Sequence, residues 1–252
     1  MKIQIVILFL IVPLTVTGQT NLYIVGTVHA RTKNFNPDSV LNILSKLKPD
    51  LILVELDSSF FDDEFNLKIR TPTNETIGIK KYVSKRPTPI RPYDVRGRKR
   101  AINVIEVEAE SLDRISSIKQ RLDASQRQTY IDFKRTNEEV ISFLKKKPRE
   151  INQIYTNVLV EQNQLLMYKG LLEIIESRSE LDDLKVGYRQ CGVFWDYRNK
   201  RMVQHILSFL NMDVFRNKTI VLFTGFIHKY YLLNQLMPKQ EMGGFVIKEY
   251  YE

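Results

Sequence analysis

Short apolar runs alternate with an amphipathic segment near the start of the chain. Residues 21–25 (NLYIV) and 51–54 (LILV) are runs of β-branched and large apolar residues, which predict buried strands. Between them, apolar residues recur at helical spacing over residues 40–47, and Asp38 or Ser39 can cap this helix. A strand, a helix and a second strand within about 35 residues indicate a βαβ unit with parallel strands.

The same pattern returns near the end of the chain. Residues 219–223 (TIVLF) predict another buried strand, followed by a helix over residues 227–236. An amphipathic helix is expected over residues 198–210. A last strand, at an edge of the sheet, is expected over residues 244–250. Residues 90–95 (IRPYDV) predict a shorter strand, which its proline places at an edge of the sheet.

The middle of the chain, about residues 101–180, has a different composition. Glycine and proline almost disappear there, and apolar residues recur every three or four positions. We expect three or more long helices, inserted into the α/β domain or lying over it as a lid. The predicted fold is therefore α/β, with a central, mostly parallel sheet, flanking helices and a large helical insertion.

The first residues resemble a cleaved signal sequence. Met1 and Lys2 supply a positive start, and residues 3–16 are almost wholly apolar. This apolar run is shorter than the about 20 residues that span a bilayer, and small residues follow it up to Gly18. We therefore expect a signal peptide over residues 1–18, a single domain over residues 19–252, no stable membrane span after cleavage, and a secreted or periplasmic protein.

Net charge, cysteine count and motif search exclude several classes of function. The chain of 252 residues carries a net charge of +9, or +8 without Lys2, but it has no nucleic-acid-binding motif, so no nucleic-acid partner is expected. Cys191 is the only cysteine, so no intramolecular disulfide can form, and it stands in no familiar nucleophile motif. The serine motif Gly-X-Ser-X-Gly and the zinc motif HExxH are both absent.

Two of the three histidines stand in the same local pattern. Gly26 precedes His29 by three residues after the first predicted strand, and Gly225 precedes His228 in the same way after the strand at 219–223. Ligands of open α/β sheets bind beyond the carboxyl ends of the strands, where glycine allows a sharp turn and close approach of a ligand. We therefore expect both histidines at one rim of the sheet, although a lone histidine there is more often a structural cap.

Two acidic residues are predicted at the same rim. Glu55 follows the second strand and Asp94 ends the third. Two imidazoles and a carboxylate form a plausible divalent-metal set, so His29, His228 and Glu55 are candidate ligands of Mn, Co or Zn. Glu55 is alternatively the general base that deprotonates a water, or only a helix cap. Asp94 is also a common turn residue.

Further motifs accompany the two Gly-X-X-His motifs: residues 49–56 (PDLILVEL), and Arg198-Asn199 with Met202. Together and in this order, they resemble the motifs of the TraB/PrgY/TIKI superfamily. This group includes GumN-like proteins and, more distantly, erythromycin esterase-like and ChaN-like proteins. The resemblance extends from residue 22 to residue 236. The membrane spans of TraB and PrgY proteins have no counterpart here.

The resemblance implies a hydrolase. TIKI-like members are described as metal-dependent proteases, TraB/PrgY-like members are linked to peptide pheromones, and the esterase-like relatives open a macrolide ester or lactone ring. On this basis a peptide or small-molecule ester is the expected substrate. His29, His228 and Glu55 match the family's site positions, and its arginine, at the start of a late helix, corresponds to Arg198.

In the expected mechanism, a metal ion or the histidines orient a water, Glu55 acts as base, and Arg198 stabilises the oxyanion or binds a substrate carboxylate. Asp196 is expected to cap the helix of Arg198. Gly26, Gly225, Asp94 and Arg198 are the expected substrate-binding residues. Two alternatives stay open: a non-catalytic protein that binds a peptide or haem at this rim, and an inactive scaffold whose helical region binds a partner protein.

Overall fold

The computed structural model describes residues 18–30, 32–68, 72–96 and 103–252. The predicted signal peptide falls outside these ranges, apart from Gly18. Within them, no helix combines the length and apolar character needed to cross a membrane.

The described strands form one five-stranded parallel sheet in the order β3-β2-β4-β1-β5. The strand order differs from a simple βαβ unit, because β4 lies between β1 and β2. Phe223 of β4 is opposite Val25 of β1 on one side and Val54 of β2 on the other. The predicted edge strands are confirmed as β3 and β5. The strands are β1 (Thr20–Thr27), β2 (Leu51–Val54), β3 (Ile90–Pro92), β4 (Thr219–Gly225) and β5 (Phe245–Lys248).

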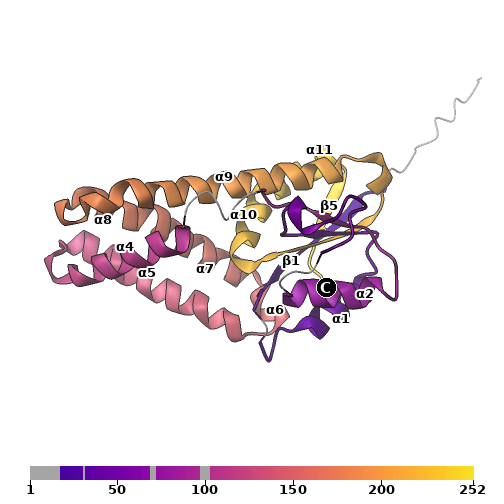
Figure 1. The fold of residues 1–252 in the computed structure, drawn as a ribbon, viewed down its shortest axis with the longest axis horizontal. Coiled ribbons are helices and arrows are strands. Elements are labelled where there is room, and N and C mark those ends of the chain that lie inside the picture. The colour runs from indigo at the N-terminus through magenta and orange to yellow at the C-terminus, as the bar shows by residue number, and fades with distance from the viewer. Residues whose placement is uncertain (1–17, 31, 69–71, 97–102) are drawn as a thin grey trace, which may run out of the picture.

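Alternate residues of the central strands pack against helices on opposite faces of the sheet. On one face, the sheet contacts α1 (Pro37–Leu47) and α2 (Asn74–Val83). On the other face, it contacts the end of α9 (Lys185–Leu210) and the second half of α10 (Phe226–Leu236). Figure 1 shows the sheet between these layers. Burial on both faces explains why the central strands are continuous apolar runs.

The helical region extends the molecule lengthwise, away from the sheet (Figure 1). It has its own core, which includes Ile115, Phe133, Leu171 and Tyr188, the last of these from α9. The long helix α9 therefore joins the two parts, because it packs on the sheet at one end and on this core at the other. The elements of this region are α4 (Val104–Ser117), α5 (Ala124–Ser142), α6 (Pro148–Ile151), α7 (Ile154–Leu165), a π-helical segment (Leu166–Gly170) and α8 (Leu171–Ser177).

Two predicted helix starts are wrong. Asn36 caps α1, because its side chain accepts from the backbone N–H groups of Asp38 and Ser39. Helix α9 begins at Lys185, so Arg198 lies in its middle and Asp196 caps nothing; Asp196 pairs with Lys200 at 2.6 Å. Gly187 and Gly192 have low helix propensity, so the sequence does not indicate a helix over the first half of α9. Burial of apolar side chains against the helical core compensates for this low propensity.

Candidate functional site

The carboxyl ends of the parallel strands bring the predicted site residues together. His29 lies two residues after β1, Glu55 directly follows β2, and Asp94 lies two residues after β3. His228 is in the first turn of α10, which continues from β4. Both histidines approach Glu55, since Oε1 lies 3.7 Å from His228 Nε2 and 3.9 Å from His29 Nε2. The fifth residue, Arg198, reaches the rim from the middle of α9.

The Arg198 guanidinium lies at the centre of this cluster. It donates to both carboxylate oxygens of Asp94 at 2.9 Å and to Glu55 Oε1 at 2.5 Å. Its Nη1 lies 2.8 Å from His228 Nε2. The side chain is only 11% exposed, and those of Glu55 and Asp94 are 4% and 0% exposed. Four of the five guanidinium N–H donors are thus used within the site.

Glu55 is held as a carboxylate. Its second oxygen, Oε2, accepts from the Thr224 hydroxyl at 2.9 Å and from the Gly225 backbone N–H at 2.6 Å. Burial raises the pKa of Glu55, but its interactions with His228, Arg198 and His29 and the Gly225 hydrogen bond outweigh burial and hold the pKa far below its usual range. A carboxylate with so low a proton affinity is a poor general base.

His228 is a buried, neutral imidazole. Asn199 fixes its tautomer: the Asn199 amide nitrogen donates to the Trp195 carbonyl at 2.8 Å, so its oxygen faces His228 Nδ1, also at 2.8 Å. Nδ1 therefore carries the hydrogen, and Nε2 accepts from Arg198. Burial lowers the pKa of His228 to about 4. The Trp195 ring stacks on the imidazole at 4.4 Å between centroids.

The neutral state of His228 makes stability depend on pH. In the unfolded chain its pKa is 6.5, so below that value the unfolded state binds a proton that the folded state excludes. We expect the contribution of His228 to lower the free energy of unfolding as the pH falls from 6.5 to 4.5, by about 1.4 kcal/mol per unit. Glu55 and Glu75, whose pKa values are lowered, reduce stability only below pH 4.5.

Urea unfolding across this window tests the expectation. A His228→Gln variant should show a shallower decline between pH 6.5 and 4.5 than the unchanged protein. Equal slopes in the two proteins would contradict a neutral, buried His228.

His29 has a different partner, Glu75, which no local pattern in the sequence indicates. His29 Nδ1 lies 2.8 Å from Glu75 Oε1, while Nε2 lies 3.9 Å from Glu55 Oε1. The His29 side chain is 51% exposed, whereas the other site side chains above are nearly buried. The Thr27 hydroxyl also donates to Glu75 Oε1. Hydrogen bonds from His29 and Thr27 outweigh burial and lower the pKa of Glu75.

A tertiary contact sets the position of Glu75. It lies in the first turn of α2, next to Asn74. The Asn74 side chain donates to the carbonyls of Val28 and Ala30, on either side of His29, and so fixes α2 to the loop that follows β1. No spacing rule in the sequence relates Glu75 to His29, which lies 46 residues earlier.

His29, Glu55 and Glu75 line a small cavity of about 180 Å³, together with five neighbours, Val54, Leu56, Thr73, Thr76 and Phe223. Gly225 permits this close arrangement, because a Cβ there would lie 3.1 Å from His29 Nε2. Glu75 Oε2 is buried and accepts no hydrogen bond from the described residues, so it can accept one from a molecule in the cavity.

Gly26, predicted to bind substrate, has a packing role. Its backbone N–H donates to Asn152 Oδ1 at 2.6 Å, and its carbonyl accepts from the same side chain. A Cβ at Gly26 would lie 3.2 Å from the Phe226 backbone. Gly26 therefore allows β1 to pack closely against α10.

The predicted metal ligands do not fit a metal ion in this arrangement. The Arg198 guanidinium donates to Glu55 Oε1 and to His228 Nε2, so a cation already occupies these two lone pairs. Among the described residues, no three His, Cys, Asp or Glu side chains are grouped to hold a metal ion.

The third histidine, His205, and the single cysteine lie outside the site. His205 Nδ1 is 2.9 Å from the Tyr93 carbonyl. Cys191 is buried in the helical region, where burial raises the pKa of its thiol to about 11. A thiol with this pKa is protonated at neutral pH, which argues against a cysteine nucleophile.

Comparison with known proteins gives no match, either to a protein-family model, to a curated protein or to a solved structure. Function therefore has to be inferred from the site itself.

Proposed function

We propose that this protein is a hydrolase that cleaves a peptide or ester bond, with His29 as the general base and Glu75 as its orienting carboxylate. The observation that carries the proposal is the 2.8 Å contact between His29 Nδ1 and Glu75 Oε1 at the edge of a cavity. A carboxylate on one ring nitrogen selects the tautomer whose other nitrogen accepts a proton. The second nitrogen, Nε2, lies next to the cavity residue Glu55.

The reaction needs only water as co-substrate. His29 Nε2 takes a proton from the water as its oxygen attacks the carbonyl carbon, and Glu75 stabilises the resulting imidazolium. When the tetrahedral intermediate collapses, the bond to the leaving oxygen or nitrogen breaks, and His29 returns the proton to it. Glu55 Oε1, at 3.9 Å from Nε2, adds a second negative charge beside the imidazolium.

Arg198 has a positioning role in this mechanism. Its hydrogen bonds to Glu55, Asp94 and His228 fix the inner wall of the site. With four donors engaged, it is better placed to keep the carboxylates ionised than to bind a substrate oxyanion directly. No metal ion is required, because a guanidinium already supplies the central positive charge.

We also propose that the chain belongs to the TraB/PrgY/TIKI superfamily and that the protein is secreted or periplasmic. The paired Gly-X-X-His motifs support the first and the apolar N-terminal sequence supports the second. The haem alternative is less well supported, because the cavity of about 180 Å³ is smaller than the about 300–1,000 Å³ typical of pockets for drug-sized ligands.

A substrate screen with metal control tests the proposal. The purified protein would be assayed on p-nitrophenyl esters of increasing acyl length and on a fluorogenic peptide library. Each assay would be repeated after dialysis against EDTA and after adding Mn²⁺, Co²⁺ or Zn²⁺. We expect turnover that survives EDTA. Turnover only after metal is added would contradict the metal-independent mechanism, and binding without turnover would favour the non-catalytic alternative.

A further inference from the structure

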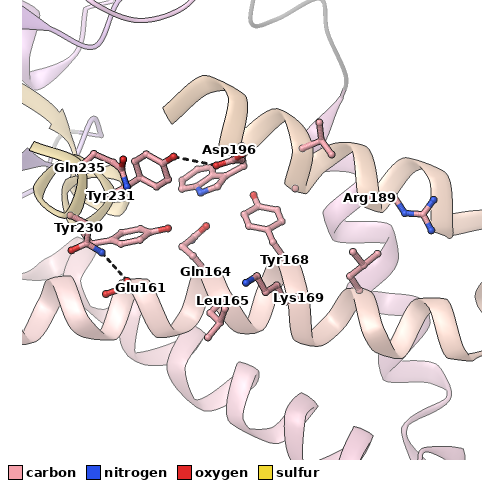
Figure 2. Close-up of a pocket in the computed structure, with 15 residues that line it drawn as sticks. Glu161, Gln164, Leu165, Tyr168, Lys169, Arg189, Asp196, Tyr230, Tyr231 and Gln235 are labelled. Atoms are coloured by element: carbon pink, nitrogen blue, oxygen red, sulfur yellow. Dashed lines mark hydrogen bonds between the residues drawn. The ribbon is translucent and has the colours of Figure 1, made fainter. Parts of the chain in front are cut away.

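A second, larger cavity of about 550 Å³ lies between α7, α9 and α10, apart from the cavity of His29 (Figure 2). Four aromatic side chains line it: Tyr168, Trp195, Tyr230 and Tyr231. Trp195 also stacks on His228, so a single indole ring lies between this cavity and the candidate active site. The proposed hydrolysis makes no use of this cavity.

One buried polar atom at this cavity, the acceptor Gln164 Oε1, has no hydrogen-bond partner among the described residues. The neighbouring donor, Trp195 Nε1, interacts with the Tyr230 hydroxyl, which belongs to the same wall. Gln164 is only 8% exposed, and Figure 2 shows its side chain extending from α7 into the space between the helices. An unsatisfied buried polar group costs about 1–3 kcal/mol, so Gln164 is expected to have a function.

The backbone beside the cavity is also irregular. The π-helical segment Leu166–Gly170 interrupts the path from α7 to α8 and supplies Tyr168 and Lys169 to the wall. Single π-helical turns inside α-helices occur frequently at functional sites.

Of the four charged groups in the wall, Asp196 and Arg189 form ion pairs with neighbours. Glu161 accepts from Asn234 at 2.9 Å, and Asp196 pairs with Lys200 and accepts from Tyr231. Arg189 pairs with Glu176 at 2.5 Å. Lys169 and Glu161 are exposed to solvent, whereas the buried group that remains to be satisfied is a neutral acceptor, Gln164 Oε1. A neutral donor such as an amide N–H would satisfy it.

We propose that this cavity binds an aromatic side chain together with its flanking amide group. The ligand N–H donates to Gln164 Oε1, and the ring packs among the tyrosines and Trp195. This inference rests on the proposed function, which it deepens: the substrate is a peptide or peptide-like molecule with an aromatic residue near the cleaved bond.

The single tryptophan of the chain gives a direct test, because Trp195 is the only source of tryptophan fluorescence. The unchanged protein would be titrated with N-acetyl-phenylalaninamide, and with ethylbenzene as a matched ligand that lacks the amide. Both should change the fluorescence in a saturable way. Gln164→Leu should weaken the amide ligand about tenfold and leave ethylbenzene binding unchanged or tighter.

Gln162→Leu is the matched control, because Gln162 is an exposed glutamine on the same helix. No response to N-acetyl-phenylalaninamide, or equal weakening in both variants, would overturn the proposal. The outcome is separable from that of the substrate screen. Hydrolysis without a fluorescence response would reject this cavity and keep the hydrolase, whereas saturable binding in a protein without hydrolysis would keep the cavity and reject the hydrolase.

Discussion

Replacing Arg198 with methionine is expected to lower the free energy of unfolding by about 3–5 kcal/mol. The substitution keeps most of the side-chain volume but removes the guanidinium that contacts Glu55 and Asp94. Both carboxylates have side chains exposed by no more than 4%, so the variant leaves two like charges buried without their cation. Urea unfolding at neutral pH would measure the loss.

Two further variants separate charge from packing. Arg201→Met changes an exposed arginine three residues further along α9, where the side chain donates to Gln204, and should cost less than about 0.5 kcal/mol. Adding Glu55→Gln and Asp94→Asn to Arg198→Met removes the unpaired charges and should recover part of the loss. A similar loss in the Arg198 and Arg201 variants would contradict a buried ion-pair network.

The sequence predicts the α/β class, the parallel strands and the convergence of His29, Glu55 and His228 for a shared physical reason. Strands buried on both faces must be apolar throughout, and residues that follow parallel strands must meet at one rim. The sequence does not predict the order of the strands in the sheet. The apolar runs at 21–25, 51–54 and 219–223 are alike in composition, so nothing in them indicates that the last lies between the first two.

The side-chain partners at the rim depend on long-range contacts, which local sequence patterns do not predict. Glu75 reaches His29 because Asn74 fixes α2 to the loop after β1, across 46 residues of sequence. Arg198 reaches Glu55 from the middle of α9, across 143 residues. Two imidazoles and a carboxylate at one rim favour a metal ion at their centre. In the structure, hydrogen bonds place the Arg198 guanidinium there. Residue types and spacing do not distinguish these two sources of positive charge.

The largest effect on activity is expected at His29. His29→Ala should lower kcat/KM for any substrate found in the screen by about 10²–10⁴-fold, because it removes the group that takes the proton from water. The free energy of unfolding should change by less than about 1 kcal/mol, since this side chain is 51% exposed. His205→Ala, which removes the histidine outside the site, should keep its activity. Steady-state kinetics and urea unfolding on the same preparations would measure both quantities.

Glu75 should affect the same step through His29. Glu75→Gln retains the shape of the side chain but replaces the carboxylate at His29 Nδ1 with an amide, so the tautomer with a basic Nε2 loses its stabilisation. We expect kcat to fall strongly with KM little changed, and Glu75→Asp to restore part of the rate. Because Glu75 acts only through His29, the double variant with His29→Ala should be no slower than His29→Ala alone. Independent, multiplicative losses would show that Glu75 has a separate role and that the proposed base–carboxylate pair is wrong.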